Sequence, residues 1–216
     1  MNDKLEVLDL RRNKLNGTIP DVFPNNCGLQ TLALNQNQLQ GGLPKSLANC
    51  IGLEFLDIGN NHIKGTFPIY LKNTSLLRVL VLRSNKFYES ITHPKLNVTW
   101  PMLQILDIAS NNFTGNLPII LLLSWTSLMD REHEVDRELN YLGFFVHFTY
   151  EDTITITRKG SKVELVKIPT IFTVLDFSCN NFDGHIPREI GELTLLYSLN
   201  LSHNSFTGKI QHLWEN

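Results

Sequence analysis

One short stretch of the chain carries enough ionisable side chains to suggest metal or hydrolytic chemistry. Residues 130–138 read DREHEVDRE, and His133 with Glu134 begins the HExxH pattern of zinc-dependent proteases. Arg137 occupies the position of the second histidine, and a zinc site needs three or four convergent ligands. We therefore interpret this stretch as a solvated surface segment of mixed charge and expect no metal and no cofactor.

Catalysis has no better candidate elsewhere in the sequence. There is no GxSxG elbow and no glycine-rich phosphate loop. Dispersed aspartates could suggest acid–base pairs, but they share one position of the repeat described below and would form a column on one face. These aspartates are Asp9, Asp57, Asp107 and Asp176. We predict that the protein is not an enzyme.

The three cysteines, Cys27, Cys50 and Cys179, leave at least one thiol unpaired, and none lies in a CxxC spacing. Cys27 and Cys50 lie in similar phrases, NNCGL and ANCIGL, nearly one repeat apart. Adjacent coils could bring them close, although a bridge requires α-carbons within about 7 Å. We favour buried thiols over a disulfide.

Five triplets match the acceptor pattern for N-linked glycans in a secreted protein. We expect modification only if the protein enters the secretory pathway. The acceptors are Asn16, Asn73, Asn97, Asn112 and Asn200.

The composition excludes several classes of protein. A net charge of -2 does not indicate a nucleic-acid partner, and 42% hydrophobic residues fit a soluble globular class. The longest apolar run, residues 119–123, is far below the roughly 20 residues that span a bilayer. Met1 leads into charged residues rather than a signal peptide, so we expect neither signal nor anchor in this chain.

The chain repeats the pattern LxxLxLxxNxLxGxIP seven times. A period of this size predicts a solenoid, in which each coil buries its apolar side against its neighbours. Strand alternation in VLDLR points Leu8 and Leu10 inward and Val7, Asp9 and Arg11 outward, so the strands should stack into a parallel sheet. The aligned asparagines are Asn13, Asn37, Asn61, Asn85, Asn111, Asn180 and Asn204.

Three residue types recur at fixed positions of the repeat for physical reasons. The asparagine amide satisfies backbone groups where the strand bends, the glycine allows a bend or close packing, and the proline directs the chain to the far side. The fourth repeat departs from the pattern, with Glu89 in place of glycine and Thr92 in place of proline. We expect its far side to be irregular.

A segment from Leu121 to Ile168 matches no repeat. Its end, YEDTITITRKGSKVELVKI, alternates around Lys159 and Gly160 and predicts a β-hairpin with either a two-residue or a four-residue loop. Placing apolar residues opposite apolar residues sets the register. The predicted pairs are Ile156 with Val163, Ile154 with Leu165, and Asp152 with Lys167.

The repeat resembles the leucine-rich repeat, and its GxIP ending is similar to the plant extracellular subtype. Tyr150, eight residues, then Lys159 and Gly160 resembles the Tyr-x8-Lys-Gly motif of the island domain in plant leucine-rich-repeat receptor-like proteins. The resemblance implies an α/β-type repeat solenoid, right-handed and twisted, with a parallel β-sheet on the concave face and loops or 3-10 turns on the convex side. It also implies a second short sheet. The expected domains are five coils in 1–120, an island in 121–168 with its hairpin at 150–168, and two coils in 169–216.

The resemblance also implies a function. Such proteins are plasma-membrane glycoproteins of plant defence that bind a peptide or protein ligand outside the cell and signal through adaptor and co-receptor kinases. The family carries a cap, further coils and a membrane helix that this chain lacks, so we expect a truncated part of such a receptor. Kinase-bearing relatives with an island remain open. The alternatives are a secreted inhibitor of a microbial cell-wall-degrading enzyme and a non-functional truncated gene product.

The outward positions of the middle strands are the candidate ligand site, because a stacked solenoid offers a broad rigid surface there. We expect the apolar ones to be exposed and to form a patch beside charges. The candidates are Phe55, Asp57, Val79, Val81, Arg83, Ile105 and Asp107. Tyr150, Lys159 and Gly160 of the island are the candidate contacts for a co-receptor.

Overall fold

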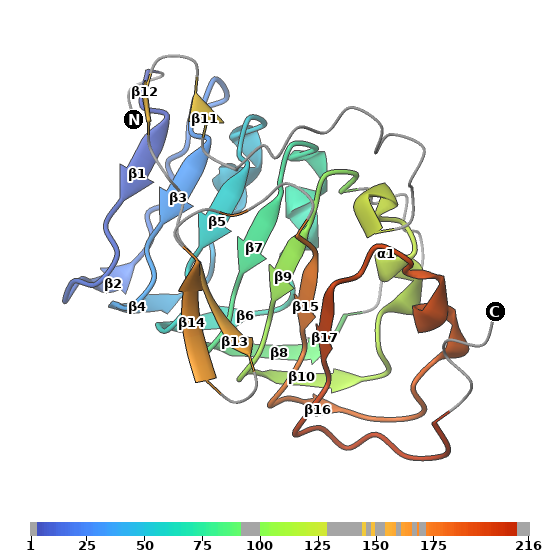
Figure 1. The fold of residues 1–216 in the computed structure, drawn as a ribbon. Helices are drawn as coiled ribbons and strands as arrows, with labels where there is room; N and C mark the ends of the chain where they lie inside the picture. The colour runs from blue at the N-terminus through green and yellow to red at the C-terminus, as the bar shows by residue number, and fades with distance from the viewer. Residues whose placement is uncertain are drawn as a thin grey trace.

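The computed structural model describes residues 4–91, 100–128, 144–145, 148–149, 154–158, 161–165, 168 and 172–210. Over these residues the chain winds into stacked coils, each of which contributes one short strand to a parallel sheet (Figure 1). We call this the concave sheet. Each strand aligns with the same repeat position in the next coil, as in Leu8 opposite Leu32 and Leu32 opposite Leu56. The predicted solenoid is confirmed.

The concave sheet has seven strands within the described residues, ordered as the coils follow one another. The coils on either side of the interruption are direct neighbours, because β9 pairs with β15. The strands are β1 (Val7–Asp9), β3 (Thr31–Ala33), β5 (Phe55–Asp57), β7 (Val79–Val81), β9 (Ile105–Asp107), β15 (Val174–Asp176) and β17 (Ser198–Asn200).

A second parallel sheet forms where each coil has turned away from the concave sheet. The residue before each aligned asparagine adopts a positive φ, as in Asn60 (54°) and Ser110 (56°), which makes this turn. Glu89, with φ 69°, adopts the conformation that glycine has elsewhere, so the second-sheet strand of the fourth coil is intact. The strands are β2 (Asn16–Thr18), β4 (Gln38–Gly41), β6 (His62–Gly65), β8 (Lys86–Ser90), β10 (Asn112–Gly115) and β16 (Asn181–Phe182).

The aligned asparagines form a hydrogen-bonded ladder between the two sheets, as predicted. The Oδ1 of Asn61 accepts from the Leu39 amide of the preceding coil at 3.0 Å. Its Nδ2 donates to the carbonyls of Leu34 and Ile58, each at 3.1 Å. One side chain therefore satisfies buried backbone groups of two adjacent coils.

Several coils carry a single helical turn on the convex side. Short 3-10 helices follow proline in three coils, at Lys45–Asn49, Ile69–Asn73 and Arg188–Glu192, and α1 (Ile119–Leu122) follows Pro118. The far side of the fourth coil, residues 92–99, lies outside the described residues. A cluster of aromatic rings and one or more apolar side chains from each turn fill the space between the sheets and the helices, the turn residues being Leu47, Leu71, Leu121, Leu122 and Ile190. The Trp100 indole donates to the Leu71 carbonyl at 3.0 Å.

A disulfide joins the first two coils on the convex side. Cys27 and Cys50 are bonded, with their α-carbons 4.6 Å apart. Our preference for two buried thiols is wrong, because coil stacking places equivalent positions at the short separation that a disulfide requires. Cys179 is free and exposed.

The interruption begins later than the sequence suggests. Leu121, Leu122, Trp125 and Leu128 are buried in the same core as the coils, so the fifth coil continues to a 3-10 turn at Thr126–Leu128. The predicted start of the island at Leu121 therefore lies within this coil.

Two antiparallel ribbons belong to the interrupted segment, β11 (Phe144–Phe145) with β12 (Phe148–Thr149) and β13 (Ile154–Arg158) with β14 (Ser161–Leu165). In the second ribbon, which we call the hairpin, Ile154 lies opposite Leu165 and Ile156 opposite Val163. The predicted register is confirmed over these strands. The connection and the Asp152–Lys167 pair lie outside the described residues.

Candidate functional site

The structure brings the predicted ligand-site residues together on adjacent strands of the concave sheet. Phe55 is paired with Val79, and Val79 with Ile105, so these side chains form one row across β5, β7 and β9. A second row contains Asp57, Val81 and Asp107. The repeat therefore placed these residues correctly relative to one another.

The expectation that these side chains are exposed is wrong. Phe55 is 2% exposed, Val81 1%, and Val79 and Ile105 0%. They form an apolar cluster with Ile154 at the start of the hairpin and with Ile168, and Phe172 packs against its edge. We call this the covered cluster. Figure 1 shows β13 and β14 lying across the concave sheet.

Sequence reasoning missed Ile154 and Ile168 as the cover, although a signal was present. An isolated two-stranded hairpin is marginally stable in water and needs an apolar surface to pack on. The row of Phe55, Val79 and Ile105 offers such a surface in the same chain. Two apolar faces without another partner could have been matched to each other.

Charged side chains lie beside the covered cluster. Asp57, Asp107 and Asp176 are 2% to 4% exposed, and Arg83 is 9% exposed. The Arg83 guanidinium binds the Asp107 carboxylate, with Nη1 and Oδ2 2.7 Å apart. The other Asp107 oxygen accepts from the Ala109 amide at 3.0 Å. Three carboxyl groups and one guanidinium are thus buried along four adjacent strands.

Burial shifts the acidity of two of these carboxyl groups. It raises the pKa of Asp57 to about 7, against the opposing effects of the Gly59 amide, Arg11 and Arg83. Burial also raises the pKa of Asp107 to about 7, although the neighbouring Arg83 favours its ionised form. The uncharged form of each carboxyl is therefore favoured beneath the cover in mildly acidic solution.

Gly59 makes room for the Arg83 side chain. A Cβ at Gly59 would lie 2.9 Å from Cγ of Arg83 and 3.1 Å from Oδ1 of Asp57. The aliphatic part of Arg83 therefore crosses the neighbouring strand where a side chain is missing. Nothing in the repeat pattern marks this glycine, because it occupies an outward position that varies between coils.

Some of the remaining predicted sites lie within the described residues, and others lie outside them. Tyr150, Lys159 and Gly160 lie outside the described residues, as does Asn97. Among the glycan acceptors, Asn16, Asn73 and Asn112 are exposed. Asn200 is half-buried on the concave sheet, and its Oδ1 accepts from both the amide and the hydroxyl of Ser202.

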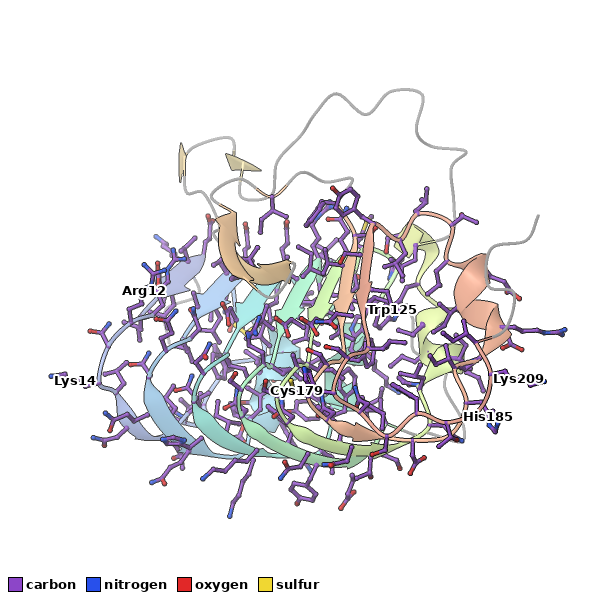
Figure 2. All side chains as sticks on the ribbon, turned by 60° about the horizontal axis from the view of Figure 1, so that its bottom comes forward. Arg12, Lys14, Trp125, Cys179, His185 and Lys209 are labelled. Atoms are coloured by element: carbon purple, nitrogen blue, oxygen red, sulfur yellow. A yellow bond between two sulfur atoms is a disulfide. The ribbon has the colours of Figure 1, made fainter. Side chains whose placement is uncertain are left out.

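Figure 2 shows the side chains of the second sheet standing outward along one flank of the solenoid. Lys14 lies at the end formed by the first coil, and His185 and Lys209 lie at the end formed by the last coils. Within the part of the chain that the structure describes, no helix is both long and apolar enough to cross a membrane.

Two family models match the sequence. A leucine-rich-repeat model matches residues 3–63, and a second leucine-rich-repeat model matches residues 102–128, 172–193 and 195–216. The matches fall on the coils and leave out most of the interruption. Together they cover more than half of the chain.

Several curated relatives come from Arabidopsis thaliana. Receptor-like protein 34 is 41% identical over 126 residues, which are 58% of this chain and 12% of that protein. Receptor-like protein 33 is 42% identical over 122 residues, which are 56% of this chain and 13% of that protein. The chain thus spans about an eighth of the length of these relatives.

Solved structures resemble the whole chain. The ectodomain of the Arabidopsis thaliana receptor kinase GASSHO1/SCHENGEN3, in complex with CASPARIAN STRIP INTEGRITY FACTOR 2, is 28% identical with a TM-score of 0.69. That match covers 96% of this chain and 19% of the ectodomain. The structure of PEPR1–AtPEP1 is 25% identical with a TM-score of 0.65 and covers 99% of this chain and 27% of the matched chain.

Proposed function

Because the chain belongs to the leucine-rich-repeat receptor-like proteins of plants, we propose that it is a ligand-recognition part of a cell-surface receptor in immune signalling, without enzymatic activity. The receptor binds a peptide or protein ligand outside the cell. Two similar solved structures, of an ectodomain with CASPARIAN STRIP INTEGRITY FACTOR 2 and of PEPR1–AtPEP1, support this choice of ligand class.

The covered cluster is the observation that carries the proposal. Phe55, Val79 and Ile105 form an apolar row that accepts Ile154 and Ile168, with Arg83 and Asp107 at its side. A surface that accepts apolar side chains from separate segments of the chain suits a peptide that presents apolar side chains. The ligand therefore either displaces Ile154 and Ile168 from the row or binds where the hairpin meets the concave sheet.

The proposed setting is the extracellular face of the plasma membrane. The Cys27–Cys50 disulfide supports an oxidising compartment, because disulfides are rare in the cytosol. Exposed acceptors at Asn16, Asn73 and Asn112 fit a secreted glycoprotein. Membrane attachment would come from a transmembrane helix elsewhere in the receptor.

Adaptor and co-receptor kinases are the proposed signalling partners. The island residues Tyr150, Lys159 and Gly160 are the proposed contacts for the co-receptor. The hairpin next to them packs on the concave sheet through Ile154, so a ligand that moves the hairpin would also change the surface offered to a partner kinase. Recognition of the ligand and recruitment of the partner kinase would then be coupled through the hairpin.

The test measures ligand-dependent capture of a co-receptor kinase by the receptor in plant cells. Tyr150→Ala with Lys159→Ala should abolish capture, whereas Lys86→Ala on the exposed face of β8 should leave it unchanged. Surface abundance of each variant is measured in parallel. Normal capture by the Tyr150→Ala, Lys159→Ala variant at normal abundance would contradict the proposed role of the island.

A further inference from the structure

The outer face of the second sheet at β8 and β10 has a tightly fixed register. Phe87 and Phe113 point into the core, where their rings stack with centroids 6.1 Å apart and planes 7° from parallel. Tyr88 follows Phe87 and Asn112 precedes Phe113, so both side chains point outward. The two residues lie opposite each other in the sheet. A slip of either strand by one residue would turn its phenylalanine to the exposed face, so this pairing is strongly specified.

Tyr88 and Asn112 are both available on this face. The Tyr88 side chain is 44% exposed although it is a large aromatic group. Asn112 is exposed, and within the described residues its side chain makes no hydrogen bond. Thr114, which completes the NFT acceptor triplet, is also exposed. Among the described residues of the coils, nothing therefore occupies either side chain.

We propose that Tyr88 is the packing site for the first sugar of an N-linked glycan on Asn112. The two strands lie about 4.8 Å apart, so a sugar ring bonded to Nδ2 of Asn112 stands beside the Tyr88 ring. The flat aromatic face is then covered by the apolar C–H face of an N-acetylglucosamine, which removes apolar surface from water. The hydroxyl end of Tyr88 stays in water.

The modification rests on the proposed function, because it requires passage through the secretory pathway. There, Nδ2 of Asn112 attacks C1 of the sugar in a polyprenyl-diphosphate-linked oligosaccharide. The C1–oxygen bond to the diphosphate breaks, the N–C1 bond forms, the amide loses a proton, and the polyprenyl diphosphate leaves. No oxidant or reductant is consumed.

The other exposed acceptor on this sheet lacks an aromatic neighbour. Asn16 on β2 lies opposite Gln38 on β4, so a glycan at Asn16 has no aromatic ring directly opposite it on the neighbouring strand. This pair is a matched control, since both acceptors are exposed and both lie on second-sheet strands. The proposal therefore assigns a structural role to one glycan and none to the other.

The test is a double-mutant cycle on the full 216-residue chain secreted from eukaryotic cells, with melting temperature as the measurement. Tyr88→Ala should lower the melting temperature of the glycosylated chain by about 2 to 4 °C, and should have little effect when Asn112→Gln has removed the glycan. The changes in melting temperature caused by Asn16→Gln and by Gln38→Ala should be additive. Additive effects of Tyr88→Ala and Asn112→Gln would overturn the proposal.

A second measurement does not depend on stability. Radical oxidation of the Tyr88 ring should be slower in the wild-type chain than in Asn112→Gln, and equal rates would overturn the proposal. Mass spectrometry of the glycopeptides separates the two failures. An unmodified Asn112 beside modified Asn16 and Asn73 overturns this inference alone, whereas three unmodified acceptors would also contradict the glycoprotein assignment in the proposed function.

Discussion

The concave sheet and the second sheet are built from the same coils, yet their outward positions have opposite environments. On the concave sheet, Val79 and Val81 are almost completely buried beneath the interrupted segment. On the second sheet, Lys86 and Tyr88 of the same coil are exposed. A repeat fixes which way a side chain points, but a segment outside the repeat decides whether that side chain meets water.

The largest expected effect comes from the ladder that joins the two sheets. Asn111→Ala removes the acceptor for the Phe87 amide and the donor for the Leu82 carbonyl. The buried Phe87 amide is left without a partner, and the Leu82 carbonyl keeps only its bond from the Asn85 side-chain amide, so we expect the free energy of unfolding in urea to fall by about 3 to 5 kcal/mol.

Asn13 is the matched control, since it is exposed and donates only to carbonyls of its own coil. Asn13→Ala should cost less than about 1 kcal/mol. Equal losses for the two variants would mean that the ladder contributes nothing beyond local turn structure.

The second prediction compares, at two pH values, the effect of replacing a buried carboxyl on the concave sheet with the effect of replacing an exposed carboxyl beside the second sheet. The folded-state pKa of Asp57 is raised to about 7 from an ordinary value of 3.8, so the protonated form is favoured by folding. The resulting stability is present below pH 4 and is lost as the pH rises through 7. At pH 8, Asp57→Asn should be more stable than the wild type by up to about 3 kcal/mol, with little difference at pH 4.

Urea titrations at these two pH values provide the measurement. Asp183→Asn, on the exposed side of the second sheet, is the control and should change the free energy of unfolding by less than about 0.5 kcal/mol at either pH. A destabilised Asp57→Asn variant at pH 8 would show that the carboxylate is stabilised by its surroundings.

The third prediction compares two glycines. Gly59→Ala forces a Cβ against Arg83, whereas a Cβ at Gly42 on the second-sheet side would meet only the Lys64 carbonyl at 3.8 Å. We expect Gly59→Ala to cost about 1 to 3 kcal/mol by thermal unfolding, and Gly42→Ala to lie within about 0.5 kcal/mol of the wild type. A neutral Gly59→Ala would mean that Arg83 can leave its position freely.

Much of the fold was predictable because its determinants recur or act locally. The ladder followed from asparagine at one repeat position, and the hairpin register followed from placing Ile156 opposite Val163. The Cys27–Cys50 bridge was missed because the separation between adjacent coils, not the phrase around each cysteine, decides it.

The environment of the candidate site was not predictable in the same way. Ile154 and Ile168 share one cluster with Phe55, about 100 positions away in the sequence, and no spacing in the sequence marks this packing. Burial is also the main cause of the raised pKa of Asp57. Long-range packing of a non-repeating segment therefore determined the exposure of the apolar row.

The most direct test of the cover is the rate of radical oxidation of Phe55, measured by mass spectrometry in the wild-type chain and in Ile154→Asp. A carboxylate at position 154 cannot remain in an apolar cluster without a partner, so it should lift the hairpin. We predict that Phe55 is protected in the wild type and becomes reactive in Ile154→Asp, while Tyr88 reacts equally in both. A Phe55 ring that reacts in the wild type as fast as in the variant would contradict the account.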